Sequence, residues 1–332
     1  MRNLLWPAFS VALAGTAVLS VLAAFAESSW PADLAANFRL QYLVVGALAL
    51  LVIGVRALAG GVITLRRDLP WIAVAFAIVA SNTASAWRLF AEDAPSATLP
   101  PARGVPLEIA SANLFFMNGQ HAAALDWARR ERPEILLFIE TTAEWRRALA
   151  PLESDYPHTQ YVTDRTHHGL LLLSRWPLSD VVTLPPGSDA EDRPVIFATV
   201  TKDGTPFRLA AMHATWPLRP FEARMRATDL AALAAESKRR GTLPFVGLGD
   251  LNISPFSPHF RKLLLDGRLR SAAAGRGWLP TWPAPFPPLG LQIDHALVSP
   301  EVQVERFRRG PSIGSDHLPI VVELRLPARA GG

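Results

Sequence analysis

Cysteine is absent from the 332-residue chain, and charged residues are scarce. The lack of cysteine excludes disulfides, thiolate metal sites and a cysteine nucleophile, and it fits an oxidising compartment without requiring one. Charged residues make up 19% of the chain and hydrophobic residues 50%, whereas soluble domains contain roughly 25% charged residues. The composition therefore indicates apolar segments that serve something other than a water-soluble core.

Three apolar runs in the first third of the chain account for this imbalance. They are residues 4–26, 40–65 and 69–87. Each is close to the ~20 residues that a membrane-crossing helix requires, so the sequence predicts three transmembrane helices within residues 1–93. One alternative is a cleavable signal peptide for the first run, since Ala24-Phe25-Ala26 resembles a cleavage site. For the other two runs the alternative is a helical hairpin in a soluble core, which nothing nearby would cover.

The basic residues around these runs predict the orientation of the chain. Arg2 precedes the first run, and Arg66 and Arg67 lie between the second and the third. Because basic residues favour the cytoplasmic side, the N-terminus is expected in the cytoplasm. Three crossings then place the rest of the chain on the periplasmic or extracytoplasmic side of the cell inner (cytoplasmic) membrane, as would cleavage after Ala26.

Residues 94–106 contain four prolines and predict a short, stiff linker to a domain at residues 107–327. In that domain apolar runs typical of strands alternate with helical patterns, which predicts an α/β fold. The predicted strands are 107–112, 135–139, 169–174, 195–201, 207–213, 243–248, 293–298 and 319–326, and the predicted helices are 120–130 and 220–239.

Acidic, amide and imidazole side chains recur where these strands end. They are Asn113, Glu140, His213 and Asp250. Because strand ends in α/β sheets converge on one edge, these side chains are candidates for a shared pocket. For Glu140 alone the competing interpretation is a helix cap or a solvated turn residue, and for Asp250 it is an Asx turn.

Two further segments strengthen the interpretation. Asp250-Leu251-Asn252 follows a buried strand, and the alternation of strand residues would aim Asp250 and Asn252 the same way. Asp294 leads one late strand, with His295 expected to point away from it, and Ser315-Asp316-His317 precedes the last strand. A Ser-Asp-His run at that place is hard to explain as ordinary loop chemistry.

In order along the chain, these motifs resemble those of the endonuclease/exonuclease/phosphatase superfamily, the DNase I-like group. The resemblance covers roughly residues 105–327, and its motifs are Ser111-Ala112-Asn113, Phe138-Ile139-Glu140, Gly169 through Ser174-Arg175, Met212-His213, Gly249-Asp250-Leu251-Asn252, Ile293-Asp294-His295 and Ser315-Asp316-His317. It implies a four-layer α/β sandwich, in which two mixed sheets pack face to face with helices outside, and a phosphoester hydrolase.

The resemblance also implies roles for individual residues. Glu140 would be the main metal ligand, with Asn113 and Asp316 beside it, and such oxygen ligands suit Mg²⁺ or Mn²⁺. Asp250 would orient or deprotonate the attacking water. The expected phosphate donors are Asn252, His213 and His317, and Asp294 would hold His317 in its tautomer and orientation.

The substrate class is less defined than the chemistry. The first 102 residues hold six of the 33 Lys and Arg and five of the 29 Asp and Glu, which leaves the remainder at only +3. Nucleic acid is favoured as the phosphodiester, although the arginines are scattered, such as Arg239, Arg240, Arg261 and Arg308. The alternatives are a phospholipid, sphingolipid or inositol-phosphate esterase, and a non-catalytic membrane protein that binds a phosphorylated ligand.

Other residues near the motifs are candidates for contact with the substrate. Arg165, Arg175 and Arg193 are candidates for the border of the phosphate pocket, and His167 and His168 are more simply explained as a solvated loop. Trp216, Trp278 and Trp282 are expected to pack in the core or anchor loops, and the alternatives are base stacking or a place at the membrane surface.

Overall fold

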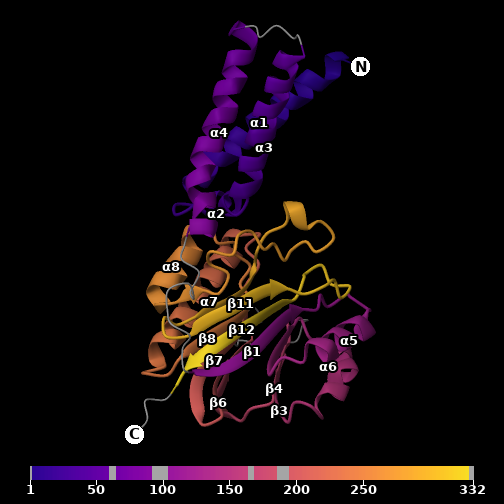
Figure 1. Ribbon diagram of the computed structural model, residues 1–332, viewed down its shortest axis with the longest axis vertical. Helices are drawn as coiled ribbons and strands as arrows, with labels where there is room; N and C mark the ends of the chain where they lie inside the picture. The colour runs from indigo at the N-terminus through magenta and orange to yellow at the C-terminus, as the bar shows by residue number, and fades with distance from the viewer. Residues whose placement is uncertain (1, 60–64, 92–103, 164–167, 185–193, 329–332) are drawn as a thin grey trace. The chain divides into compact units, whose positions relative to one another are not determined.

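The computed structural model describes residues 2–59, 65–91, 104–163, 168–184 and 194–328 (Figure 1). The chain forms two compact units, Met1–Ala91 with Pro255–Phe260 and Glu92–Ser254 with Arg261–Gly332. The first is called the helical unit and the second the α/β unit. Residues 94–103 of the predicted linker lie outside the described residues.

Three helices of the helical unit are long and apolar enough to cross a membrane, as the sequence predicted. The helices described are α1 (Arg2–Ala23), α2 (Trp30–Ala36), α3 (Arg39–Leu58) and α4 (Leu65–Ala91). The candidate membrane spans are Trp6–Ala23, Arg39–Leu58 and Asp68–Trp87. The second apolar run was expected to continue to residue 65, but α3 ends at Leu58 and residues 60–64 lie outside the described part of the chain. Helix α2 was not predicted, because seven residues carry too short a periodic pattern.

Polar contacts join the long helices of this unit to one another. The side-chain nitrogen of Asn82 in α4 donates to the hydroxyl of Ser20 in α1 at 2.7 Å. Arg56 in α3 and Asp68 in α4 form an ion pair at 2.9 Å. A buried polar group is costly unless it is bonded, so such contacts favour the helix faces that bring these groups together.

The α/β unit contains two six-stranded mixed sheets. Sheet A has the order β11-β12-β1-β2-β4-β3, and sheet B has the order β5-β6-β7-β8-β10-β9. The strands of sheet A are β1 (Gly104–Asn113), β2 (Ile135–Ile139), β3 (His158–Val162), β4 (Leu170–Ser174), β11 (Gln303–Arg309) and β12 (Ile320–Pro327). Those of sheet B are β5 (Leu178–Leu184), β6 (Val195–Lys202), β7 (Thr205–His213), β8 (Phe245–Asp250), β9 (Arg270–Ser271) and β10 (Asp294–Val298).

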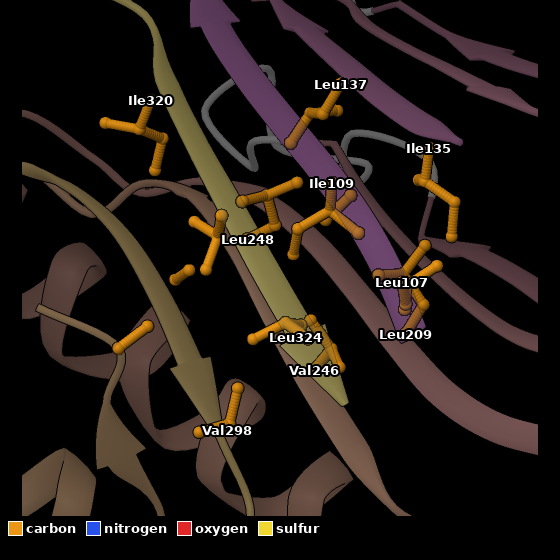
Figure 2. Close-up of a cluster of buried hydrophobic side chains, with 14 of the residues drawn as sticks. Leu107, Ile109, Ile135, Leu137, Leu209, Val246, Leu248, Val298, Ile320 and Leu324 are labelled. Atoms are coloured by element: carbon orange, nitrogen blue, oxygen red, sulfur yellow. The ribbon is translucent and has the colours of Figure 1, made fainter. Parts of the chain in front are cut away.

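Apolar side chains from the two sheets meet in one core. Figure 2 shows Ile109 and Leu137 of sheet A together with Leu209 and Leu248 of sheet B in this layer, and all four are fully or almost fully buried. Central strands with buried residues on both faces read as continuous apolar runs, which is why the sequence predicted them directly. Two packed mixed sheets with flanking helices confirm the predicted four-layer sandwich.

Helices cover the outer faces of the sheets (Figure 1). The helices beside sheet A are α5 (His121–Glu131) and α6 (Ala143–Leu149), and those of the second half are α7 (Pro220–Arg239) and α8 (Pro258–Gly267). Trp127 of α5 and Trp145 of α6 are buried in a second core with Phe138 of β2. Glu236 of α7 forms a buried ion pair with Arg208 of β7 at 2.6 Å, which ties that helix to sheet B.

The strand registers bring the predicted polar residues to one edge of each sheet. β1 runs parallel to β2, with Asn113 opposite Ile139, the residue before Glu140. β7 runs parallel to β8, with His213 opposite Asp250, and Asp294 of β10 lies opposite Asp250 on the other side. The two parallel pairs are connected through α5 and α7, as parallel strands require a crossover.

We expect Leu137→Ala to destabilise the α/β unit by about 2–5 kcal/mol, because it removes a fully buried side chain from the layer between the sheets. The measurement is the unfolding midpoint of the full chain in detergent micelles, followed by near-UV circular dichroism. Leu265→Ala is the matched control, since Leu265 is exposed and its truncation should change stability by no more than ~0.5 kcal/mol. Equal effects of the two changes would contradict this assignment of the core.

Candidate active site

The side-chain amide of Asn113 is hydrogen bonded to a carboxylate from each sheet. Its nitrogen donates to Oε1 of Glu140 and to Oδ2 of Asp250, at 3.1 Å in both cases. Its oxygen accepts the backbone N–H of Phe115 at 3.0 Å. Glu140 follows β2 in sheet A and Asp250 ends β8 in sheet B, so the structure brings together three predicted residues at the junction of the sheets.

Glu140 is held in an uncommon backbone conformation. Its φ is 58°, in the left-handed region, which a residue with a long side chain rarely adopts. Its second carboxylate oxygen accepts the backbone N–H of Phe116 at 3.1 Å. Strain of this kind costs on the order of 1–3 kcal/mol and concentrates at functional sites. The turn after β2 thus fixes the direction of this carboxylate.

Asp250 and Asn252 form an Asx turn directly after β8. The backbone N–H of Asn252 donates to Oδ1 of Asp250 at 2.9 Å, and Asn252 has a φ of 49°. Its side-chain nitrogen donates to the carbonyl of Ala214 at 2.9 Å. The sequence predicted that strand alternation would aim Asp250 and Asn252 the same way. This explanation does not apply, because β8 ends at Asp250 and the backbone of Asn252 is in the left-handed region. One oxygen of Asp250 forms the Asx turn and the other accepts from Asn113. Asp250 is therefore both a turn residue and a member of the cluster, the two roles that the sequence left open.

Gly249 allows β7 and β8 to approach each other just before their ends. Its φ is 151°, and an added Cβ would lie 1.9 Å from the carbonyl oxygen of Met212. Real Cβ atoms do not come so close to a backbone oxygen, so only glycine fits. This close approach keeps His213 opposite Asp250.

Two histidines complete the cluster. His317 Nδ1 lies 2.9 Å from Oδ2 of Asp294, the pair that the resemblance implied. Ligand-type atoms of Asp250, Asp294 and His317 all lie within 4.8 Å of one another, and all three residues are buried. His213 Nε2 lies 3.7 Å from Asp250 and 3.9 Å from Glu140. One buried cluster therefore contains residues from β7, β8, β10 and the segment before β12.

The environment shifts the pKa values of two members of this cluster in the same direction. Burial, and secondly the charge of Asp294, raises the pKa of Asp250 to about 7. For His317, burial is the largest single effect and lowers the pKa, but Asp294, Asp250 and Asp316 together outweigh it and raise the pKa to about 10. At neutral pH His317 is thus a cationic donor, and Asp250 is poised to accept a proton.

The three side chains of the segment Ser315-Asp316-His317 form hydrogen bonds with different partners. The hydroxyl of Ser315 donates to the carbonyl of Asn113 at 2.7 Å, which ties this segment to β1. The carboxylate of Asp316 accepts the indole N–H of Trp282 at 3.0 Å. In the described part of the chain, Asp316 forms no hydrogen bond with Asn113 or Glu140. Trp282 was expected to anchor a loop, and its bond to a site carboxylate is a feature that no spacing in the sequence signalled.

The cluster is rich in carboxylates and poor in cations. Among the described residues, no Lys or Arg forms an ion pair or hydrogen bond with Glu140, Asp250, Asp294 or Asp316. Their hydrogen-bond partners are amide, indole, imidazole and backbone N–H groups. Crowded, buried carboxylates repel one another, as the raised pKa of Asp250 indicates. A divalent cation with a preference for oxygen ligands fits such a set.

Residues that the sequence treated as possible neighbours of the site lie at several different places. His295 points away from the cluster, as expected, and its Nε2 donates to the carbonyl of Ile253 at 2.8 Å. His168 was expected in a solvated loop, but its ring is half-buried and lies 5.8 Å from that of His213. Arg175 follows the end of β4 that pairs with the start of β2, so it lies at the opposite end of sheet A from Glu140. Arg165, His167 and Arg193 lie outside the described residues.

The chain belongs to the endonuclease/exonuclease/phosphatase family, whose model matches residues 110–317. This match includes every residue of the cluster and confirms the resemblance seen in the motifs. Members of the family are phosphoester hydrolases that use divalent metals. Among curated proteins, no sequence matches this chain.

Solved structures of the same fold include proteins with different partners. One is an endonuclease/exonuclease/phosphatase from Beutenbergia cavernae, 20% identical, with a TM-score of 0.56, covering 67% of this chain and 72% of its own. A second is the 3′ phosphatase NExo from Neisseria bound to a product DNA hairpin, 22% identical, with a TM-score of 0.53, covering 65% and 98%. A third is D. rerio TDP2 complexed with a single-stranded DNA product, 15% identical, with a TM-score of 0.55, covering 66% and 98%. At these identities the likeness establishes the fold.

We expect the stability of the α/β unit to fall as the pH falls from about 6.5 to about 4, in part because of His295. Burial lowers the pKa of His295 from 6.5 to about 4. Between these values the unfolded chain binds a proton that the folded chain does not, so the stabilisation present above pH 6.5 is lost on acidification. One such proton corresponds to ~1.4 kcal/mol per pH unit.

The measurement compares urea unfolding of the natural chain and of His295→Gln across this pH range, by tryptophan fluorescence in detergent micelles. Glutamine retains a donor for the carbonyl of Ile253 but does not titrate. The free energy of unfolding of the variant should therefore depend less steeply on pH, by up to ~1.4 kcal/mol per pH unit, the contribution of one proton. Parallel curves for the two proteins would show that His295 does not contribute.

Proposed function

We propose that this chain is a membrane-anchored, divalent-metal-dependent phosphodiester hydrolase in which water attacks the phosphorus directly. The observation that carries the proposal is the convergence of Glu140, Asp250 and Asp294 with two histidines around the amide of Asn113. A phosphodiester is anionic and repels a nucleophile, so its hydrolysis requires positive charge at the phosphate and a base beside the water. In this proposal Asp250 is the base, and a divalent cation held by the carboxylates, together with protonated His317, would supply the positive charge.

We assign the metal to Mg²⁺ or Mn²⁺ because the ligands are oxygen atoms. In this assignment Glu140 is the main ligand, with Asn113 and Asp316 proposed beside it. The amide of Asn113 bonds to Glu140, whereas the carboxylate of Asp316 bonds to Trp282. Asn113 is placed with its nitrogen toward Glu140, so its part in holding the ion would be to orient that carboxylate. When bound, the ion would polarise the phosphoryl oxygen and stabilise the leaving oxygen.

The residues of the chain would then divide the remaining work. Asp250 accepts a proton from the attacking water as its oxygen forms a bond to phosphorus, and a pKa near 7 suits this role. Protonated His317, oriented by Asp294, donates to a non-bridging phosphate oxygen, as do His213 and Asn252. One ester bond from phosphorus to oxygen breaks and the leaving oxygen takes up a proton. The products are a phosphomonoester and an alcohol.

We also propose that the three long helices cross the cytoplasmic membrane and that the α/β unit acts on its extracytoplasmic side. Support comes from the length and apolar character of the helices. It also comes from Arg2, Arg66 and Arg67, because basic residues favour the cytoplasmic side of a membrane. A non-catalytic role as a sensor of phosphorylated ligands is disfavoured, because a chain that only binds would be expected to have lost one of the catalytic residues, and Glu140, Asp250, Asp294 and His317 are all present.

Removal of divalent metal should abolish hydrolysis of a soluble aryl phosphodiester by the full chain in detergent micelles. The reason is that, among the described residues, no Lys or Arg side chain is bonded to the clustered carboxylates, and the one cationic group beside them, His317, is already paired with Asp294. We expect release of the chromogenic alcohol to stop in excess EDTA and to return when Mg²⁺ or Mn²⁺ is restored. Full activity in the chelator would refute the metal-dependent mechanism.

The change Asp250→Asn should lower kcat by ~10²- to 10⁴-fold, the usual contribution of a general base. Folding should be retained, because asparagine can still accept the N–H of Asn252 and relieves the crowding of buried carboxylates. Asp266→Asn is the matched control, since Asp266 is an exposed residue of α8 paired with Lys262. The measurement is kcat of both variants with circular dichroism as the test of folding, and equal rates would remove Asp250 from its proposed role.

A further inference from the structure

Three loops that are bonded to residues of the site carry exposed apolar side chains. Five large side chains are each between 51% and 67% exposed. They are Met117, Trp216, Leu218, Phe286 and Leu289, together called the apolar rim. Trp216 was expected to pack in the core or to anchor a loop, and its 51% exposure excludes the core. Apolar groups gathered in this way mark an interaction surface more often than an ordinary surface.

Each of the three loops that carry the apolar rim is tied to a residue of the site. In residues 114–120, the backbone N–H of Phe116 donates to Glu140. In residues 214–219, the carbonyl of Ala214 accepts the side chain of Asn252, at 2.9 Å. In residues 280–290, the indole of Trp282 donates to Asp316. The three loops that carry the apolar rim are therefore all attached to the cluster, and these bonds restrain them.

The three loops carry almost no charge. Residues 114–120 and 280–290 contain no charged residue, and residues 214–219 contain only Arg219. A protein that grips nucleic acid needs Lys and Arg side chains against the phosphates, because that contact supplies most of the affinity. These described loops present aliphatic and aromatic groups at the places where a nucleic-acid strand would need cations.

Two of the four arginines that the sequence suggested for nucleic acid, and one of the three suggested for the border of the phosphate pocket, are engaged by other partners. Arg240 pairs with Glu301, and Arg308 forms two hydrogen bonds with Glu131. Arg175 lies over the ring of Tyr156, with its guanidinium carbon 5.3 Å from the ring centroid. Arg240 precedes β8 and so lies at the end of that strand opposite Asp250. Arg175 and Arg240 thus lie at strand ends opposite the site, and Arg308 is held by Glu131.

The chain itself supplies an apolar phase for such a rim. Helix α4, which contains one of the candidate membrane spans, ends at Ala91, and β1 begins at Gly104. Residues 92–103 are thus all that separates, in sequence, a helix that a membrane could hold from the first strand of the α/β unit. Tryptophan with aliphatic side chains and a nearby arginine is the composition that favours the interface between headgroups and acyl chains.

We infer that the apolar rim inserts into the surface of the lipid bilayer that holds the chain, so that the phosphodiester hydrolysed in the adjacent site is that of a phospholipid headgroup. The lipid substrate rests on the proposed hydrolase function, whereas insertion into the bilayer rests on the apolar rim alone.

Insertion is tested with the full chain in nanodiscs of phosphatidylethanolamine and phosphatidylglycerol. Because the chain has no cysteine, Phe286→Cys accepts a single environment-sensitive fluorophore. Thr242→Cys is the matched control, an exposed position before β8 at the end of that strand opposite the site. Spin-labelled lipid should quench the label at position 286 and not at position 242. Absence of quenching at 286, or equal quenching at both, would overturn the inference.

Substrate class is tested in the same nanodiscs. The double change Leu218→Ser and Phe286→Ser should lower release of product from the lipids at least tenfold and leave hydrolysis of a soluble aryl phosphodiester within twofold. Leu265→Ser, which removes an exposed leucine of α8 outside the rim, should leave both rates unchanged. Equal loss of lipid hydrolysis in the control, or no loss in the double variant, contradicts the inference.

Two further outcomes separate the inference from the function on which it rests. Hydrolysis of the aryl phosphodiester and of a single-stranded oligonucleotide, without hydrolysis of lipid, would overturn the lipid substrate and leave the hydrolase intact. Failure to hydrolyse any of the three, even with Mg²⁺ and Mn²⁺, would overturn the proposed function, while quenching at position 286 would still decide whether the rim inserts.

Discussion

The arrangement of the site depends on one amide group that joins the two sheets. Asn113 ends a central strand of sheet A, and its side chain donates both to Glu140 of the same sheet and to Asp250 of the other. The pair His317 and Asp294 makes a second link of the same kind, between the segment before β12 and β10. Apolar burial between two packed sheets is not directional, whereas the polar bonds at the edge of that layer are directional and define one alignment of the site residues. The same bonds that align the sheets therefore bring the reacting groups together.

Much of this fold could be predicted from the sequence, and the missing elements share a physical property. The predicted strands are central in the sheets, and their residues are buried on both faces, as in Ile135–Ile139. The strands that were missed, β3, β5, β9 and β11, lie at the four sheet edges. Edge strands are half-solvated and carry polar residues, as His158–Val162 does, so their apolar signal is weak. Helix α6 was missed because it is short, and α8 because its proline-rich surroundings read as a loop.

The site was predicted at the level of residue types and order, and less well at the level of contacts. Strand ends were sufficient to nominate Asn113, Glu140, His213 and Asp250, because the direction of parallel strands brings their ends to one edge. The turn at Asn252, the indole of Trp282 on Asp316 and the half-buried ring of His168 depend on loop conformations that no periodic pattern encodes. The exposure of the apolar rim is of the same kind, since composition alone suggested that its tryptophan was a core or anchor residue.

Gly249 has no functional group, yet the site depends on it. One methyl group at that position would push apart the two middle strands of sheet B just where His213 faces Asp250. The damage would be spatial, with every acid and imidazole still present and only their separation altered. A screen of random inactivating substitutions in this chain would consequently include a position that takes no part in any bond-making step, and its hits would outline the scaffold as well as the chemistry.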